Sequence, residues 1–443
     1  MKIRTWLNVL LVAVPATLVV WYLSRQSGYT GKLTVLLFAL ALVALVPLAS
    51  LIGTFTDTLE EYLGDRLGGL IGASFSNVPE LAIGVALLVH AHMHAGDVGT
   101  VTSDQSVVLA LMIGSVINNV LFVLGSSIFL GATRNGRMNF SAESAAGYAS
   151  MLALAVVGLA LPTLATSLIT KSSDLRPTEL KISVPFGIIL ILSYIFYLAA
   201  SVFKVGEHKQ KKVIEEEAEE ARERRAQSGE AEQAEAAIAI DGAVVLSDEG
   251  EETHETELQK TIEGDEKEEE EERRQLAELR RKNPYAVPIA LVGLAIVTIV
   301  TVIMAVVLVS VTDNVIVDTS LTPLSVGLIL FPIVCNLGEQ ASSVLNAWHN
   351  RMEGAMSVAA GSSVQVALFV TPILVLVSYV LATGNSTLVL AMVFKPLELI
   401  VLGLVAFVYA LVSLDGETTW LEGLQLLAFY AMMVAVAFAL PGR

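Results

Sequence analysis

Apolar stretches about as long as a bilayer is thick recur along this chain, and they constrain its fold more than any other feature. A transmembrane α-helix needs about 20 mostly apolar residues to cross a hydrocarbon core roughly 30 Å thick. The mean hydropathy is +0.67 and 54% of the 443 residues are hydrophobic, which is untypical of a water-soluble protein. We therefore predict an all-α membrane protein with eleven transmembrane helices, near residues 6–23, 32–53, 69–92, 105–131, 144–170, 182–203, 285–311, 322–347, 354–382, 387–413 and 418–440.

The predicted helices form two blocks of five that follow a single N-terminal helix. We place the N-terminal helix in residues 1–31, the first block in 32–203, an acidic linker in 204–284 and the second block in 285–443. Because five is an odd number of crossings, the second block enters the membrane with the opposite orientation, as in the inverted repeats of many secondary transporters. The distribution of Lys and Arg predicts that the N-terminus and the linker face the cytoplasm.

The acidic balance of the chain comes from one segment. The formal net charge is −17. By composition, about 25 of the 44 acidic residues and about 10 of the 27 basic residues lie between Ile214 and Asn283. The rest of the chain is nearly neutral and has no basic surface, so nucleic-acid binding is excluded. The charged segment lacks the spaced ligands of a calcium-binding hand, and it is interpreted either as a solvated linker or as a regulatory arm.

Two Asn-x-x-Glu motifs place ionisable side chains inside apolar helices, one in each block. Asn77 precedes Glu80 in the third predicted helix, and Asn336 precedes Glu339 in the eighth. Residues three apart share a helix face, so each pair presents an amide and a carboxylate at one point. An ionised side chain at membrane depth costs about 2.5 to 3.5 kcal/mol or more, which makes such residues functional by default. We predict that an ion binds between the blocks at these glutamates.

The similarity between the blocks continues one helix further along. GSVINNVLFV at 114–123 aligns without a gap to GSSVQVALFV at 361–370, which indicates a duplication. Hydroxyl and amide oxygens in these segments add to the two carboxylates, and hard oxygen ligands without converging thiolates suit Ca²⁺ and disfavour zinc or copper. The predicted metal-binding residues are Glu80, Glu339, Asn77, Asn336, Ser115, Ser362 and Gln365.

The same two glutamates predict what calcium is exchanged for. Together they neutralise one divalent ion, and when that ion leaves, burial raises the proton affinity of a carboxylate. An empty, ionised pair would place two like charges close together in a poorly solvated site. We therefore expect the transporter to return with protons, which makes calcium/proton antiport the leading function.

Several longer segments resemble calcium/proton exchangers of the cation/calcium exchanger superfamily. They cover both blocks and most of the membrane body. The resemblance implies eleven helices, alternating access, Glu80 and Glu339 as central ligands, and the other residues named above along the pathway. The segments that carry it are TDTLEEYLGDRLGGLIGASFSN, SFSNVPELAIGVALL, GSVINNVLFVLGSSIFLGA and NLGEQASSVLNAWHNRMEGAMSVAAGSSVQVALFVTPILVLVSY.

Departures from that family's pattern leave a second counter-ion open. Ser76 and Cys335 stand where the family usually has glycine before the asparagine. Pro79 is more similar to the corresponding motif of sodium/calcium exchangers. The alternatives are therefore sodium/calcium exchange and, from a different class, a calcium-regulated channel.

A run of three histidines closes the third predicted helix. His90, His92 and His94 are candidates for a transition-metal site or a response to pH. Alternating positions do not share a helix face, and the run lies at the end of a membrane helix. We therefore expect an exposed loop.

The remaining expectations concern activity, partners and location. The chain has neither an HExxH motif nor a GxxxxGK[ST] phosphate loop, so we expect neither an enzyme nor an ATP-driven pump. Calcium and protons are expected as transported ions, with the lipid bilayer as surroundings and no resident cofactor. The plasma membrane of a prokaryote is expected rather than a vacuolar membrane, and the sequence leaves the oligomeric state open.

Overall fold

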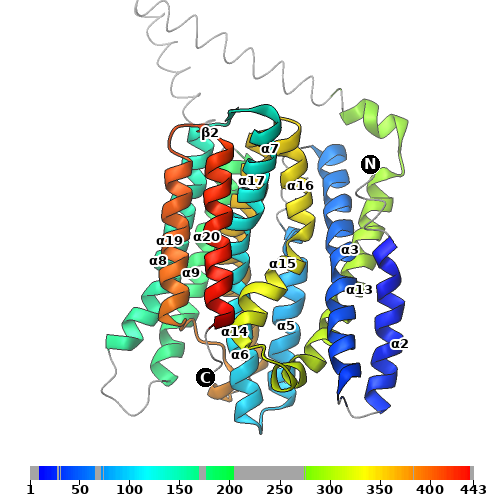
Figure 1. The fold of residues 1–443 in the computed structure, drawn as a ribbon, viewed down its shortest axis with the longest axis vertical. Coiled ribbons are helices and arrows are strands. Elements are labelled where there is room, and N and C mark those ends of the chain that lie inside the picture. Colours follow the sequence, from blue (N-terminus) through cyan, green and yellow to red (C-terminus); the bar gives the residue numbers. More distant parts are fainter. Residues whose placement is uncertain are drawn as a thin grey trace, which may run out of the picture.

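The computed structural model of this chain consists mainly of long helices (Figure 1). Apolar residues fill the interiors of these helices, and glycine, proline or polar residues interrupt them. Most of the predicted linker lies outside the described residues, so its role stays a prediction. The structure describes residues 9–26, 29, 31–64, 71–72, 74–168, 176–203, 274, 276–382 and 384–439.

The elements before the linker form what we call the first half, and those after it form the second half. Three of the short elements, η2, η3 and η4, are π-helical turns, whereas η1 and η5 are 3-10 helices. The first half contains η1 (Leu10–Val12), α2 (Ala13–Gln26), α3 (Lys32–Leu63), α5 (Val78–Met93), α6 (Val98–Ile117), η2 (Asn118–Val123), α7 (Leu124–Asn135), β1 (Met138–Asn139), α8 (Ala142–Leu168) and α9 (Arg176–Phe203). The second half contains α13 (Ala286–Asp318), α14 (Pro323–Ser325), η3 (Val326–Leu330), α15 (Phe331–Cys335), α16 (Leu337–Trp348), α17 (Met352–Gln365), η4 (Val366–Val370), α18 (Thr371–Leu381), η5 (Ser386–Leu388), α19 (Pro396–Val412), β2 (Glu417–Thr418) and α20 (Trp420–Ala439).

Many of these helices are suited to a membrane. Within the described residues, 7 helices are long and apolar enough to cross a bilayer, or 8 if a bent pair counts as one span. The bent pair joins Pro323–Cys335 to Leu337–Trp348 at an angle of 55°. Three shorter apolar helices are Leu10–Gln26, Val78–Met93 and Pro396–Val412.

Helices from the two halves pack against one another. Figure 1 shows α3 and α13 side by side, and α13 also contacts α5. The helix that runs through α6, η2 and α7 is the most buried of the long spans, and it contacts η3, α16 and α17 of the second half. A Cβ at Gly114 would lie 2.5 Å from the carbonyl oxygen of Leu328, so glycine is required where α6 crosses η3.

Two predicted helices are broken at the asparagine of their Asn-x-x-Glu motif. The helix predicted over 69–92 is interrupted by a turn at Ser76 and Asn77, and α5 begins only at Val78. The helix predicted over 322–347 bends at Asn336. Each of these two predicted spans therefore consists of two helical pieces, and the apolar pattern did not place the break. Apolar periodicity hides such breaks because the flanking residues remain buried on both sides.

The helix predicted over 387–413 is wrong at its start. Residues between η5 and α19 are not helical, and α19 starts at Pro396, where proline suits the first turn. Buried backbone outside a helix needs other partners. The amides of Leu390, Met392 and Phe394 donate to the hydroxyls of Ser378, Ser183 and Thr163, at 2.8, 2.9 and 3.0 Å.

One feature of the structure had no sequence prediction. The two-residue strands β1 and β2 pair antiparallel, with Met138 opposite Thr418 and Asn139 opposite Glu417. They join the α7–α8 connection to the α19–α20 connection. Arg137 pairs with Glu417 at 2.8 Å beside them, so the ends of distant helices are held together at this face of the protein.

Candidate ion-binding site

Glu80 lies in the first turn of α5, three residues after the asparagine at which the chain breaks. Asn77 is the N-cap of the helix, and Pro79 occupies its first turn. Proline is compatible with this position because an N–H there would have no partner inside the helix. The unpaired amides at a helix N-terminus carry a partial positive charge of about half an electron, which favours a carboxylate. The break therefore points the positive end of a half-helix at Glu80.

Glu339 occupies the equivalent place in the second half. Asn336 is the N-cap of α16, and Glu339 lies in its first turn. Gly338 precedes Glu339, and a Cβ at Gly338 would lie 2.9 Å from the carbonyl oxygen of Ala49, so glycine lets α3 approach this helix end closely. The two carboxylates thus come from two half-helices of the kind that forms substrate sites in transporters with broken helices.

Ser362 connects the motifs of the two halves. Its Oγ lies 2.7 Å from Oε1 of Glu339 and 3.0 Å from Oδ1 of Asn77, and its single proton can be donated to one of them at a time. Asn77 in turn donates through Nδ2 to Oε1 of Gln365 at 2.7 Å. Ser76 also donates to this Gln365 oxygen, at 2.9 Å. Four of the seven predicted residues therefore lie in one hydrogen-bonded network.

Asn119 belongs to this network and was missed by the sequence analysis. Its Nδ2 donates to Oε2 of Glu339 and to Oγ of Ser362, each at 3.0 Å. In the gapless alignment Gln365 corresponds to Asn118, whose Oδ1 instead accepts a hydrogen bond from the hydroxyl of Tyr430 at 3.1 Å. The π-helical turn that starts at Asn118 redirects successive side chains, and alignment alone does not show which neighbour faces the site.

The side chains of the other three predicted residues are buried and make no hydrogen bond to any residue that the structure describes. Glu80 is 0% exposed, and neither of its carboxylate oxygens has a partner. Both side-chain polar atoms of Asn336 and the hydroxyl of Ser115 are likewise buried and unpaired. Glu80 and Glu339 lie close enough to interact electrostatically. Unpaired buried polar groups are rare in folded proteins and call for a functional explanation, such as an ion that completes their contacts.

Comparison with known proteins assigns the chain to a family. Residues 33–203 and 289–439 match the family model described as sodium/calcium exchanger protein. The chain belongs to this family. It is therefore a mostly helical, multi-pass membrane protein, as the sequence analysis predicted at this coarser level. The first matched segment covers the first half from α3 to α9 but not η1 and α2, and the second covers the second half except for the start of α13.

Individual members of the sodium/calcium exchanger family resemble the chain over nearly its whole length. The Ca(2+)/H(+) antiporter of Synechocystis sp. is 31% identical over 409 residues, which cover 92% of this chain and 91% of that protein. The vacuolar calcium ion transporter of Schizosaccharomyces pombe is 27% identical over 437 residues, covering 99% and 85%. The solved structure of native YfkE matches with a TM-score of 0.66 and 24% identity, covering 97% of this chain and 100% of that chain, which establishes a shared fold.

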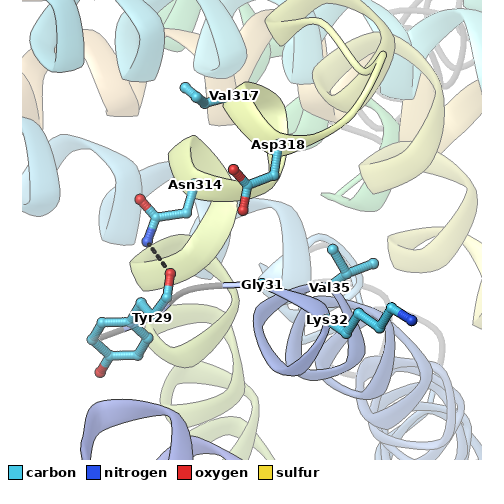
Figure 2. A pocket seen from close by; sticks show the side chains of 7 residues that line it. All are labelled: Tyr29, Gly31, Lys32, Val35, Asn314, Val317 and Asp318. Carbon is cyan, nitrogen blue, oxygen red and sulfur yellow. Dashed lines mark hydrogen bonds between the residues drawn. The ribbon is translucent and has the colours of Figure 1, made fainter. Parts of the chain in front are cut away.

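The exchanger also has a surface cavity away from the carboxylates. A cavity of about 670 Å³ lies at the turn between α2 and α3, beside the end of α13. Figure 2 shows its lining, where Asn314 donates through Nδ2 to the carbonyl oxygen of Tyr29 at 3.3 Å. None of the predicted metal ligands lines it, so the cavity is separate from the carboxylate site.

Proposed function

We propose that this exchanger is a secondary active antiporter that moves calcium against protons by alternating access. The observation that carries the proposal is a pair of carboxylates, the fully buried Glu80 and the half-buried Glu339, each in the first turn of a broken helix and each from a different half. The names of the Synechocystis and Schizosaccharomyces pombe relatives support calcium as the transported ion, and the first also names the proton.

The donor set suits calcium. Ca²⁺ takes six to eight oxygen ligands and tolerates irregular geometry. Two carboxylates balance its charge, while the unpaired side-chain oxygens of Asn336 and Ser115 need no hydrogen bond broken before they bind an ion. The oxygens of Glu339 are instead already contacted by Ser362 and Asn119. We therefore assign Glu80 and Glu339 as the charge-balancing ligands and the amides and hydroxyls as neutral ones.

The requirement for charge balance couples calcium to protons. Without an ion or a proton, the fully buried Glu80 and the half-buried Glu339 would carry two negative charges that no described side chain of opposite charge offsets. Burying an uncompensated charge costs several kcal/mol, on the order of the estimates for buried ions. Two protons remove this cost as one Ca²⁺ does. The site is thus stable when it holds either cargo, which is the condition for exchange.

We propose the eleven-helix layout with inverted five-helix repeats for the same protein. The eight long spans, with the bent pair counted as one, and the three shorter apolar helices add up to eleven segments. The two separate matches to the family model support a duplication on either side of the linker. We propose the prokaryotic plasma membrane as its location, supported by Ca(2+)/H(+) antiporters among its bacterial relatives, and we propose a transport activity without resident cofactor or enzymatic turnover.

The test is uptake of Ca²⁺ by the purified chain reconstituted into sealed vesicles. We expect an imposed proton gradient to drive accumulation, and an uncoupler to stop it. Glu80→Gln and Glu339→Gln should each abolish uptake. Glu398→Gln is the matched control, because Glu398 is also a buried carboxylate in a first helix turn but accepts from the Lys395 amide at 3.0 Å outside the network. Glutamine keeps an oxygen for that bond, so this variant should transport normally.

Three outcomes would contradict the proposal. Uptake driven by a sodium gradient but not by a proton gradient would identify a sodium/calcium exchanger. Calcium that only equilibrates across the vesicle membrane would identify a channel. Full uptake by Glu80→Gln or Glu339→Gln would show that the carboxylate pair does not carry the ion.

A further inference from the structure

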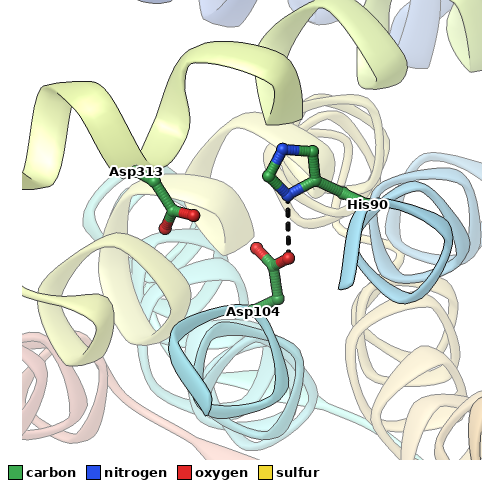
Figure 3. Close-up of side chains that lie close together, drawn as sticks. All are labelled: His90, Asp104 and Asp313. Atoms are coloured by element: carbon green, nitrogen blue, oxygen red, sulfur yellow. Dashed lines mark hydrogen bonds and ion pairs between the residues drawn. The ribbon is translucent and has the colours of Figure 1, made fainter. Parts of the chain in front are cut away.

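A second cluster of metal-ligating side chains lies far from the carboxylate pair. His90 of α5, Asp104 of α6 and Asp313 of α13 point toward one another in Figure 3. Nδ1 of His90 lies 2.8 Å from Oδ2 of Asp104. One ligand atom from each of the three residues lies within 4.8 Å of the other two. Three helices therefore bring an imidazole and two carboxylates to one point.

The cluster lacks positive charge. The side chain of Asp104 is only 2% exposed, and among the described residues its only ion pair is with His90. Asp313 accepts a hydrogen bond through Oδ1 from the Ser103 hydroxyl at 2.8 Å, but its Oδ2 is buried and unpaired. Even a protonated His90 offsets only one of the two negative charges. A divalent cation bound by neutral His90 would balance both carboxylates and complete the contacts of Asp313.

The ligand types indicate which cation fits. Imidazole nitrogen and carboxylate oxygen are both ligand types that zinc binds, and zinc sites with three protein ligands leave a fourth position for water. Calcium prefers oxygen ligands alone. We propose that His90, Asp104 and Asp313 form a binding site for a first-row divalent metal ion, and that this site binds Zn²⁺ more tightly than Ca²⁺.

The site is distinct from the proposed calcium site. His90 follows Glu80 by ten residues on the same helix, which is about 15 Å at 1.5 Å per residue. Asp313 lies near the C-terminal end of α13. The side chain of His90 is 19% exposed, which gives an ion a route from solvent. A bound metal would tie α13 of the second half to α5 and α6 of the first half.

The histidine run is thus only partly an exposed loop. His90 and His92 lie in the last turn of α5, and His94 caps it, so the loop prediction is wrong for the first two. The rings of His90 and His94 lie 4.3 Å apart, because residues four apart share a helix face. His92 is exposed on another face and has no place in the cluster. It serves as the matched control.

The experiment measures binding of Zn²⁺ alone to the purified full-length chain in detergent by isothermal titration calorimetry. We expect His90→Gln and Asp104→Asn each to lower the affinity of one Zn²⁺ equivalent by at least about tenfold, the range in which even indirect metal contacts act. Asparagine at 104 still offers an oxygen to His90, which favours a folded variant. His92→Gln should bind Zn²⁺ as the wild type does, and Zn²⁺ should raise the melting temperature of the wild type and of His92→Gln.

The proposal is overturned if His90→Gln and Asp104→Asn bind Zn²⁺ as the wild type does, or if His92→Gln loses the same equivalent. It is also overturned if equimolar Ca²⁺ displaces the ion. Glu80→Gln provides a further check, because it should retain the His90-dependent equivalent in full. None of these measurements involves transport, so failure of calcium/proton antiport in vesicles would leave this result unaffected.

Discussion

The two halves of the molecule carry the same Asn-x-x-Glu motif but treat its glutamate differently. In the first half Glu80 is fully buried, and its carboxylate has no hydrogen-bond partner within the described part of the chain. In the second half both oxygens of Glu339 are contacted, by the Ser362 hydroxyl and by the Asn119 amide. The asparagine side chains are reversed: that of Asn77 is hydrogen-bonded, and that of Asn336 has no partner among the described residues.

This difference shows which features of the site follow from the duplication and which do not. Duplication places a carboxylate at the start of a half-helix twice, so the ligand types recur. The hydrogen bonds then depend on neighbours that are not duplicated, such as Asn119, whose aligned position in the second half is Val366. The halves therefore contribute one unpaired and one tethered carboxylate to the same site.

The largest expected effect concerns the aligned glycines. A Cβ at Gly114 would lie 2.5 Å from the backbone oxygen of Leu328, whereas a Cβ at Gly361 meets only Tyr148, at 3.7 Å. Gly114→Ala should therefore destabilise the protein by about 3 kcal/mol, at the upper end for overpacking against backbone. Gly361→Ala should change stability little. Thermal unfolding in detergent measures both, and equal losses would mean that the halves pack alike here.

A smaller effect is expected for the aligned serines in calcium-free protein. Ser362→Ala removes contacts to Glu339, Asn77 and Asn119 and should cost about 2 kcal/mol, since hydrogen bonds to charged groups contribute about 1.5 to 3. Ser115→Ala removes an unpaired buried hydroxyl and should not destabilise the protein. Thermal unfolding in the presence of a chelator distinguishes them. A larger loss for Ser115→Ala would reverse the comparison.

The adjacent asparagines of η2 test the hydrogen bond that Asn119 donates to Glu339. Asn119→Ala should lower the apparent calcium affinity by about tenfold, because it removes a charge-assisted hydrogen bond worth about 1.5 kcal/mol from Glu339. Asn118→Ala loses only its bond from Tyr430 and should keep the wild-type affinity. The calcium dependence of proton-driven uptake is the measurement. The same shift in both variants would mean that Asn119 acts through packing.

The smallest expected effect concerns the unpaired carboxylate. Glu80→Gln should stabilise the calcium-free protein at alkaline pH by about 1 kcal/mol, because it removes a buried charge without breaking a hydrogen bond. The gain should shrink on acidification, when the wild-type carboxyl takes up a proton. Glu339→Gln should show no such gain because its partners favour the carboxylate. Melting curves across pH, with chelator present, test this contrast, and identical profiles would remove it.

Much of the fold and part of the site could be predicted from the sequence. Apolar length located the helices, and the paired motifs located Glu80 and Glu339. The apolar pattern does not place the breaks at Asn77 and Asn336, because the flanking residues are as apolar as a continuous span; Pro79 and Gly338 indicate only that the helices can unwind locally.

Two other features depended on distant contacts. The gapless alignment holds because both halves contain a π-helical turn at the same place, η2 and η4, so the turn leaves no trace in it. The role of Asn119 depends on where that turn points it. The surroundings of His90 include Asp313, more than two hundred residues later in the chain, and no local pattern joins them.

The non-helical segment before α19 shows a structural role for serine and threonine in such spans. Leu390, Met392 and Phe394 alternate as residues of a strand do, but their partners are hydroxyls from α18, α9 and α8 instead of a neighbouring strand. Hydroxyl groups from three helices thus accept the hydrogen bonds of these main-chain amides. A hydroxyl group deep in an apolar bundle can accordingly be committed to an amide of the main chain, and that role has to be checked before the side chain is assigned to the path of an ion.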